Sequence, residues 1–223
     1  AVAEGSFLFD RWVPDTFGIK IAIDPLKPIS ALLDIIGIRY GGLASGRLSL
    51  DMHKDYFSLS GDLGLSNSII TIDAQAIAAR REARPDQMPV VIDLGLRTGR
   101  KVEFLWPSAQ LPILRAYADS NKRLKIIYDG FTGKYSIIGD IPLRGGEVFY
   151  FQRSFYLRKG NLEFRENELS FDPTLSVRAE IRDRNDQGPV VISLVADRAP
   201  LSRFAPRFES RPALSQVEIL ALL

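Results

Sequence analysis

The chain has 223 residues, of which 46% are hydrophobic, so it is long enough to bury a large core. Lysine and arginine number 29 against 27 acidic residues, which excludes a strongly basic protein of the kind that binds nucleic acid through its net charge. The absence of cysteine excludes disulfides, zinc–thiolate sites and thiol nucleophiles, and the sequence has no run of about 18 apolar residues that would span a bilayer as a helix.

Apolar and polar residues alternate with a period of two along most of the chain, which predicts strands with one apolar face. Such strands are typical of antiparallel or curled sheets and not of doubly wound α/β folds. We count about fifteen, and a sheet of more than about ten strands has to curl, close or split. The clearest predicted strands lie at 17–24, 46–52, 89–96, 101–106, 123–130 and 161–167, followed by a hairpin over 176–200.

Glycines recur at the start of similar phrases. Gly46 opens GRLSL and Gly61 opens GDLGL, while Gly146 opens GEVFY and Gly160 opens GNLEF. This spacing predicts a repeated unit of one strand and one tight turn, although ordinary hairpins in any β protein would give a similar pattern.

Few segments predict helices. PISALLDIIG at 28–37 has a proline at its start and a glycine at its end, which favours a short helix. Residues 73–85 favour a continued strand and then a polar loop, and 107–121 favour a short helix or a loop across a sheet edge. The last eleven residues, ALSQVEILALL, have apolar side chains at helical spacing.

The sequence has no set of residues typical of a catalytic or metal site. His53 is the one histidine, and its neighbours Asp51 and Asp55 do not converge with it on a strand. Residues 182–188 lack the regular aspartates and distal glutamate of a calcium loop. We therefore expect neither an enzyme nor a metal or other cofactor. The aromatic stretch 147–160 would suit single-stranded nucleic acid, but the near-neutral charge favours two adjacent strands with packed aromatic residues.

The C-terminal third resembles the C-terminal domain of the TamB family, translocation and assembly module proteins related to AsmA-like proteins. The match runs from IPLRGGEVFYFQRSFYLRKGNLEFREN through FDPTLSVRAEIRDRNDQGPVVISL to FESRPALSQVEIL, and its aromatic strand is most similar to spirochaete-type members. Residues 120–223 match well, whereas 1–100 match only in having repeated strands. The matching positions are Gly145, Gly146, Phe155, Gly160, Phe164, Asp172, Pro173, Gly188, Pro189, Val190, Ile192, Phe208, Ser210, Pro212, Leu214, Ser215, Glu218 and Ile219.

This resemblance implies an all-β fold, a long antiparallel or mixed sheet curled into a U-shaped trough (a β-taco) with an apolar interior and few short helices. It implies one elongated domain over 1–223, a fragment of a longer chain whose inner-membrane anchor lies outside it. It also implies a periplasmic location, phospholipid or detergent acyl chains as ligands in a conduit between the inner and outer membranes, and an outer-membrane barrel-assembly protein as partner near the C-terminus.

Combined with the alternation, the resemblance predicts which side chains line the trough and which face outward. We expect that a charge at Ile126 or Val177 would stop transport and leave the fold largely intact. Two alternatives stay open: a scaffold or chaperone that holds outer-membrane proteins by strand addition, and a closed β-sandwich with the same residues in a dry core. The predicted lining is Ile19, Ile21, Leu48, Leu50, Ile92, Leu94, Phe104, Ile126, Phe164, Val177, Ile181 and Ile192, and the predicted outward side chains are Arg47, Asp93, Glu103, Lys125, Glu163, Arg178 and Glu180.

Overall fold

A computed structural model describes residues 1–10, 13–35, 38–73, 88–167 and 172–223. It confirms the all-β prediction, because fourteen strands form one large mixed sheet that carries little helix. The strands are β1 (Val2–Asp10), β2 (Val13–Ile23), β3 (Ile29–Ile35), β4 (Ile38–Met52), β5 (Phe57–Ile72), β6 (Val90–Thr98), β7 (Val102–Trp106), β8 (Leu114–Ala118), β9 (Arg123–Asp129), β10 (Lys134–Tyr150), β11 (Arg153–Asn167), β12 (Thr174–Asn185), β13 (Gly188–Pro200) and β14 (Arg207–Arg211); a 3-10 turn η1 (Leu201–Arg203) and helix α2 (Gln216–Leu222) complete the described elements.

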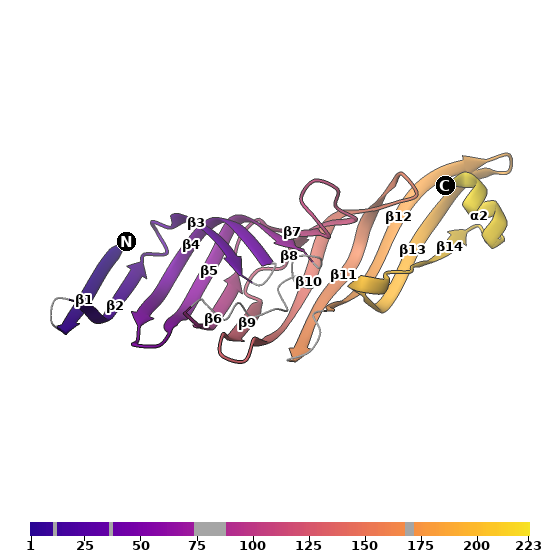
Figure 1. The fold of residues 1–223 in the computed structure, drawn as a ribbon. Coiled ribbons are helices and arrows are strands. Elements are labelled where there is room, and N and C mark those ends of the chain that lie inside the picture. Colours follow the sequence, from indigo (N-terminus) through magenta and orange to yellow (C-terminus); the bar gives the residue numbers. More distant parts are fainter. Residues whose placement is uncertain (11–12, 36–37, 74–87, 168–171) are drawn as a thin grey trace.

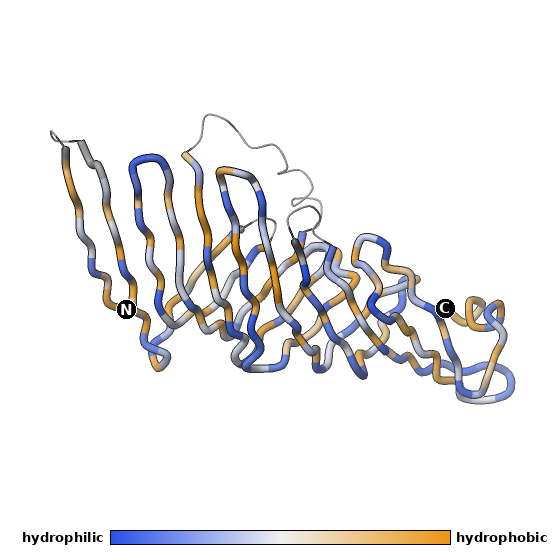
Figure 2. The backbone as a smooth tube through the Cα atoms, turned by 90° about the horizontal axis from the view of Figure 1, so that it is seen from below, coloured by the Kyte–Doolittle hydropathy of each residue, from blue (hydrophilic) through white to orange (hydrophobic). Residues whose placement is uncertain are grey.

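The sheet is elongated, with the N-terminus at one end and the C-terminus at the other (Figure 1). Its main path runs β1-β2-β4-β5-β6-β9-β10-β11-β12-β13-β14, and β3, β7 and β8 lie off this path. Almost all neighbouring strands are antiparallel; β5 is parallel to β6 and β7. Alternating hydropathy along the strands is visible in Figure 2, as expected for a sheet with one apolar face.

The long strands divide the sheet into two arms, because their two halves have different neighbours. The second half of β4 pairs with β2, whereas its first half pairs with β3. Likewise β5 pairs first with β6 and then with β7, and β10 pairs first with β9 and then with β8. We call the β1, β2, β6 and β9 side the first arm and the β3, β7 and β8 side the second arm. The long strands run through both arms and form the bend between them.

Glycines of positive φ lie inside the long strands, with Gly46 at the point where β4 changes neighbours, Gly61 in the first arm and Gly146 in the second arm. Gly46 and Gly61 have φ values of +126° and +149°, and a Cβ on either would lie 2.2 Å from a backbone carbonyl oxygen of the neighbouring strand. Gly146 has φ +131° and the same 2.2 Å approach to the carbonyl of Arg115. L side chains rarely adopt such conformations. The glycine repeat therefore lies inside strands 15 to 17 residues long, and the prediction that it marks tight turns between short strands is wrong.

Two pairs of short strands take the place of long bent strands in the middle of the sheet. These pairs are β6 with β7 and β8 with β9. The turn 99–101 separates β6 from β7 and the turn 119–122 separates β8 from β9, both at the level of the bend, so β6 and β7 together follow the course of β5. The two turns are joined by backbone hydrogen bonds from Asn121 to Thr98 (2.6 Å) and from Thr98 to Lys122 (2.9 Å). The connection from β5 to β6 runs through 73–89, of which 74–87 lie outside the described residues.

The inner faces of both arms share one hydrophobic core. Its largest fully buried side chains come from the second arm, the first arm and the C-terminal strands alike, with Phe104, Ile126 and Leu175 as examples. Each fully buried side chain of this size contributes about 1.5–3 kcal/mol relative to exposure. The core stabilises the folded-over shape because it is the place where the two apolar faces leave water.

The structure corrects two local predictions and confirms two others. In the described part of 28–37, residues 28–35, the chain forms strand β3 where a helix was predicted, and 107–121 contain a loop, strand β8 and the start of a turn. The C-terminal helical segment is confirmed as α2, and the aromatic stretch 147–160 is confirmed as the adjacent ends of β10 and β11. The prediction for 73–85 lies outside the described residues, apart from Asp73.

Candidate functional site

The structure places the twelve predicted lining residues on one side of the folded sheet. Ile21 lies opposite Leu48 and Ile19 opposite Leu50 in the pairing of β2 with β4. In the same way Leu94 lies opposite Ile126, and Ile181 lies opposite Ile192. The remaining four belong to the shared core: Ile92, Phe104, Phe164 and Val177. The twelve residues, which range from Ile19 to Ile192 in the sequence, therefore form one apolar surface.

This surface is accessible at one end and covered elsewhere. Ile19, Ile21, Leu48 and Leu50, on β2 and β4, are half-buried. In contrast, seven residues on β6, β7 and β9 to β13 are between 0% and 7% exposed, and Ile181 is half-buried near the far end. The seven are Ile92, Leu94, Phe104, Ile126, Phe164, Val177 and Ile192. Beyond β5 the trough is thus filled by the protein's own side chains, as in the closed-core alternative.

An aromatic row at the accessible end was missed by the sequence prediction. Phe7, Phe17, Met52 and Phe57 lie side by side across β1, β2, β4 and β5. The Phe7 and Phe17 rings are 5.8 Å apart and the Phe17 and Phe57 rings 6.2 Å apart. Phe7 is 56% exposed. Phe17 continues the alternation of Ile19 and Ile21, so the sequence did indicate that it lies on the apolar face. The sequence did not indicate how the four strands pair, and this pairing is what brings the row together.

We call this end of the apolar face the open floor. It is uncovered because the second arm begins at β3, which pairs with the first half of β4 only, so that β1 and β2 have no counterpart among the described strands of that arm. Apolar surface of this extent on a protein usually marks a place where something apolar binds. The open floor consists of Phe7, Phe17, Ile19, Ile21, Leu48, Leu50, Met52, Phe57 and Leu59.

The outer face of the sheet carries ion pairs between neighbouring strands. Lys125 pairs with Asp93, Arg115 with Glu103, Arg158 with Glu180 (2.9 Å) and Arg178 with Glu209 (3.1 Å). The hydrogen bond from Arg115 to Glu103 raises the pKa of the Arg115 guanidinium above its ordinary value. Exposed pairs of this kind contribute about 0–1 kcal/mol each. The main consequence of these pairs is that the outer face is polar, which identifies the opposite face of the sheet as the apolar one.

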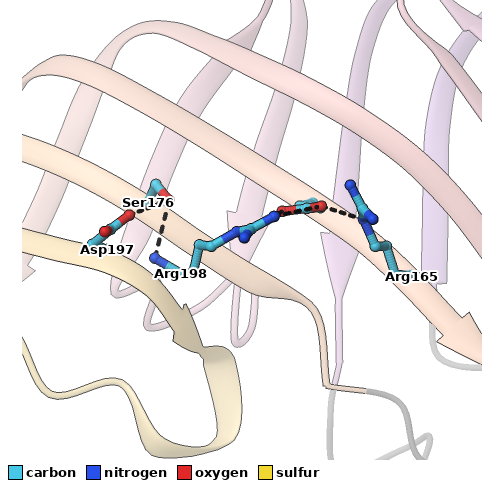
Figure 3. A network of polar contacts seen from close by, with 5 residues as sticks. Arg165, Ser176, Asp197 and Arg198 are labelled. Atoms are coloured by element: carbon cyan, nitrogen blue, oxygen red, sulfur yellow. Dashed lines mark hydrogen bonds and ion pairs between the residues drawn. The ribbon is translucent and has the colours of Figure 1, made fainter.

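Glu163 is the centre of one such network on β11. Arg198 approaches it to 3.3 Å and Arg165 contacts it from the other side, while the Arg198 backbone N–H donates to Ser176 (Figure 3). Ser176 lies 3.4 Å from Asp197. The network joins β11, β12 and β13, so its role is to hold the C-terminal strands together.

The C-terminal helix is fastened to the far end of the sheet. Ser215 and Glu218 form a capping box, in which the Ser215 hydroxyl accepts from the Glu218 N–H and the Glu218 carboxylate accepts from the Ser215 N–H. The bonds from Ser215 lower the pKa of Glu218. Arg153 donates to both Asp183 and the Leu222 carbonyl at 2.6 Å, and Ile219 is buried.

The polar residues around His53 make local contacts. His53 stacks on Tyr56 with 4.3 Å between rings, its Nε2 lies 3.5 Å from the Ser58 hydroxyl, and Asp51 accepts a hydrogen bond from Ser49. No cluster of three or more potential metal ligands occurs within the described ranges. Burial raises the pKa of Tyr40 to about 12, but its hydroxyl donates to the Leu43 carbonyl at 2.7 Å and is structural. None of the described helices has the length and apolar character to cross a membrane.

Comparisons with known proteins identify the family. A family model described as the TamB C-terminal domain matches residues 38–223, from the start of β4 to the end of α2. No curated protein and no solved structure matches the chain. The family model thus covers β4 to α2, including strands that the sequence resemblance matched only in style, whereas β1, β2 and β3 lie before the matched residues. The chain therefore belongs to the TamB family, whose members are periplasmic, inner-membrane-anchored proteins that act in outer-membrane assembly and transport.

Proposed function

We propose that this segment carries the acyl chains of phospholipids along its apolar face, as part of a bridge between the inner and outer membranes that supports outer-membrane assembly. The open floor is the observation that carries this proposal. It offers half-buried phenylalanine, leucine and isoleucine side chains, and it continues without interruption into the buried face of β6 and β9.

The energetic reason for such a floor is the cost of acyl chains in water. Each exposed CH₂ group costs about 0.8 kcal/mol, so two chains of about 16 carbons cost on the order of 20 kcal/mol. A lipid on the open floor removes much of that cost while its headgroup stays in water beside the polar β4–β5 turn, His53 to Tyr56. Because the floor presents apolar side chains and no deep polar pocket, the lipid is free to slide.

Transport beyond the floor requires the two arms to part. The side chains between them now cover one another, so in this proposal the closed section is the empty state and an arriving acyl chain replaces contacts between the arms. The exchange is close to balanced because apolar surface stays out of water before and after. The glycine bend is where the angle between the arms would change.

The partner proposed for the C-terminal end is an outer-membrane barrel-assembly protein. Among the described strands, β14 ends the path of the sheet and pairs with β13 alone. A free strand edge can add to the edge of another sheet through backbone hydrogen bonds.

A scaffold for unfolded outer-membrane proteins is the second candidate. It is favoured by β1, which lies at the other end of the described strand order and exposes Val2, Leu8 and Phe9 on its two faces. An unfolded barrel strand would find there both backbone groups and apolar side chains.

Mass spectrometry of organic extracts from the purified protein tests the first proposal. We expect bound phospholipid, and we expect the double variant Ile19→Glu/Leu50→Glu to lose it by about tenfold or more, because each carboxylate would face the acyl chain. Ser49→Glu and Lys20→Glu, together on the outer face of the same strands, are the matched control and should keep the lipid. Lipid-free wild-type protein that still binds unfolded barrel strands would favour the scaffold instead.

The structure also changes the choice of variants. Ile126 and Val177 are 2% and 4% exposed, so a charge at either position would be buried without a partner. We therefore expect those substitutions to unfold the closed section, in contrast to what the sequence suggested.

A further inference from the structure

A polar hollow lies on the outside of the bend, away from the open floor. It has a volume of about 490 Å³ and is formed where β4, β5 and the turns 99–101 and 119–122 meet. Ser45 lies opposite Gly64 on β5, which lies opposite Arg97 on β6, so the hollow belongs to the outer face. We call it the bend hollow, after the residues Ser45, Ser66, Asn67, Arg97, Arg100 and Lys101 that line it.

Three cations are gathered in the bend hollow without a paired carboxylate. Arg97, Arg100 and Lys101 are exposed and line the hollow together, and no ion pair joins any of them to another described residue. Arg115, Arg158 and Arg178 on the outer face each pair with a carboxylate, and Arg47 and Arg182, which like the hollow cations have no ion pair among the described residues, do not line this hollow. In addition, Arg123 lies directly opposite Arg97 and follows Lys122. Like charges opposite each other across two strands destabilise a sheet. A bound anion would remove this repulsion.

Nearby carboxylates do not neutralise the bend hollow. Asp119 lies 3.7 Å from Arg144, and Asp24 accepts a hydrogen bond from the Leu26 N–H. Asp62 lies on the same face two residues before Gly64 and opposite Arg47. The local excess of positive charge therefore remains, in a chain whose net charge is only +2.

The turn that carries two of the cations is rigidly held. The Asn67 N–H donates to the Arg100 carbonyl (2.8 Å) and the Ser68 N–H to the Lys101 carbonyl (3.0 Å). The Gly99 N–H donates to the Leu65 carbonyl at 2.7 Å. Thr98, which is buried, donates its hydroxyl to the Asp119 carbonyl (2.6 Å) and ties this turn to the next one. A ligand would meet cations on a backbone that is already in place, which lowers the cost of binding.

We propose that the bend hollow binds a phosphoryl group. Two guanidinium groups and one ammonium group suit a dianionic oxyanion, because arginine donates pairs of hydrogen bonds that match phosphate oxygens. The Ser45 and Ser66 hydroxyls and the Asn67 amide add neutral donors around the same hollow. The phosphoryl group belongs either to a water-soluble solute or to a lipid headgroup at a membrane surface; the acyl chains of that lipid would not lie on the open floor, which is on the opposite face.

The test is a titration of the 223-residue chain with inorganic pyrophosphate, followed by calorimetry and by the amide NMR shifts of Gly64 and Gly99. The variant Arg97→Gln/Arg100→Gln/Lys101→Gln should bind at least about tenfold more weakly than the wild type. The control Arg182→Gln/Arg184→Gln/Arg203→Gln removes the same charge from exposed sites at the C-terminal end and should bind as the wild type does. If the triple variant of the hollow does not fold, Arg100→Gln alone, in an exposed turn, should still weaken binding by about threefold.

Vesicles of phosphatidylcholine with one fifth phosphatidic acid, whose headgroup is a terminal phosphoryl group, distinguish the two sources. Co-flotation that pyrophosphate competes away supports a headgroup, and pyrophosphate binding without co-flotation supports a soluble solute. No saturable binding of either probe, or equal weakening in the hollow variant and its control, would overturn the proposal.

Discussion

The open floor and the closed section have the same sequence pattern and opposite exposure. On β2 and β4, Ile19 and Leu50 alternate with polar residues and are half-buried, and on β11 and β12, Phe164 and Val177 alternate in the same way and are almost fully buried. The difference comes from the second arm, which lies opposite the closed section and begins only at β3. Alternation therefore identifies the apolar face of a strand, whereas the topology decides whether that face is covered.

The largest expected effect is the difference in the free energy of unfolding between a truncation in the closed section and a truncation on the open floor. Phe164→Ala removes a ring that is 1% exposed and should lower the free energy of unfolding by about 3–5 kcal/mol. Leu50→Ala on the open floor should cost less than about 1.5 kcal/mol, because the side chain is only partly buried. Urea denaturation measures both, and equal losses would show that the floor is covered in solution.

The next largest effect is expected at the bend that allows one arm to cover the other. Gly46→Ala places a Cβ 2.2 Å from the Asp62 carbonyl oxygen at φ +126°, which should cost about 1–3 kcal/mol in backbone strain, with the clash in addition. Gly133→Ala is the control, since φ is +69° and no atom lies within 4 Å of the added methyl group, and it should cost about 1 kcal/mol. Thermal unfolding of the two variants compares them, and a control as unstable as Gly46→Ala would argue against a steric requirement at the bend.

A smaller effect should be confined to the helix at the closed end. Ser215→Ala removes the hydroxyl that caps α2 and should destabilise that helix by about 1 kcal/mol. Hydrogen exchange should become faster at the α2 amides and stay unchanged at the β2 and β4 amides. Faster exchange across the open floor as well would mean that the two regions are not independent.

Acid should have the smallest effect, again at α2. The pKa of Glu218 is lower in the folded chain than in the unfolded one, so its bond to the cap stabilises the helix above the ordinary glutamate range and this contribution is lost as the pH falls through the folded pKa. We expect the Glu218→Gln variant to lose this acid dependence of α2 exchange, and an unchanged pH profile would contradict the assignment.

The sequence predicted the parts of the fold that depend on local pattern. Alternation at Leu94 or Ile192 specifies an apolar face, and the helical spacing of apolar residues in the last eleven residues predicted α2. It did not predict β3, because Pro28 and Gly37 around an apolar run favour a helix until the pairing with β4 is known. It also did not predict that Gly46 bends a strand, since a turn and a mid-strand bend both require glycine at positive φ. The aromatic row of Phe7, Phe17 and Phe57 depends on strand pairing and so lies beyond local pattern.

Labelling with a phospholipid that carries a photoreactive diazirine in its acyl chain tests the central claim most directly. After irradiation of the wild-type protein, peptide mass spectrometry locates the modified residues. We expect adducts at Phe17, Ile19, Leu50 and Phe57 on the open floor, and none at Lys20 or Ser49 on the outer face of the same strands. Adducts spread equally over both faces, or none at all on β2, β4 and β5, would contradict the account.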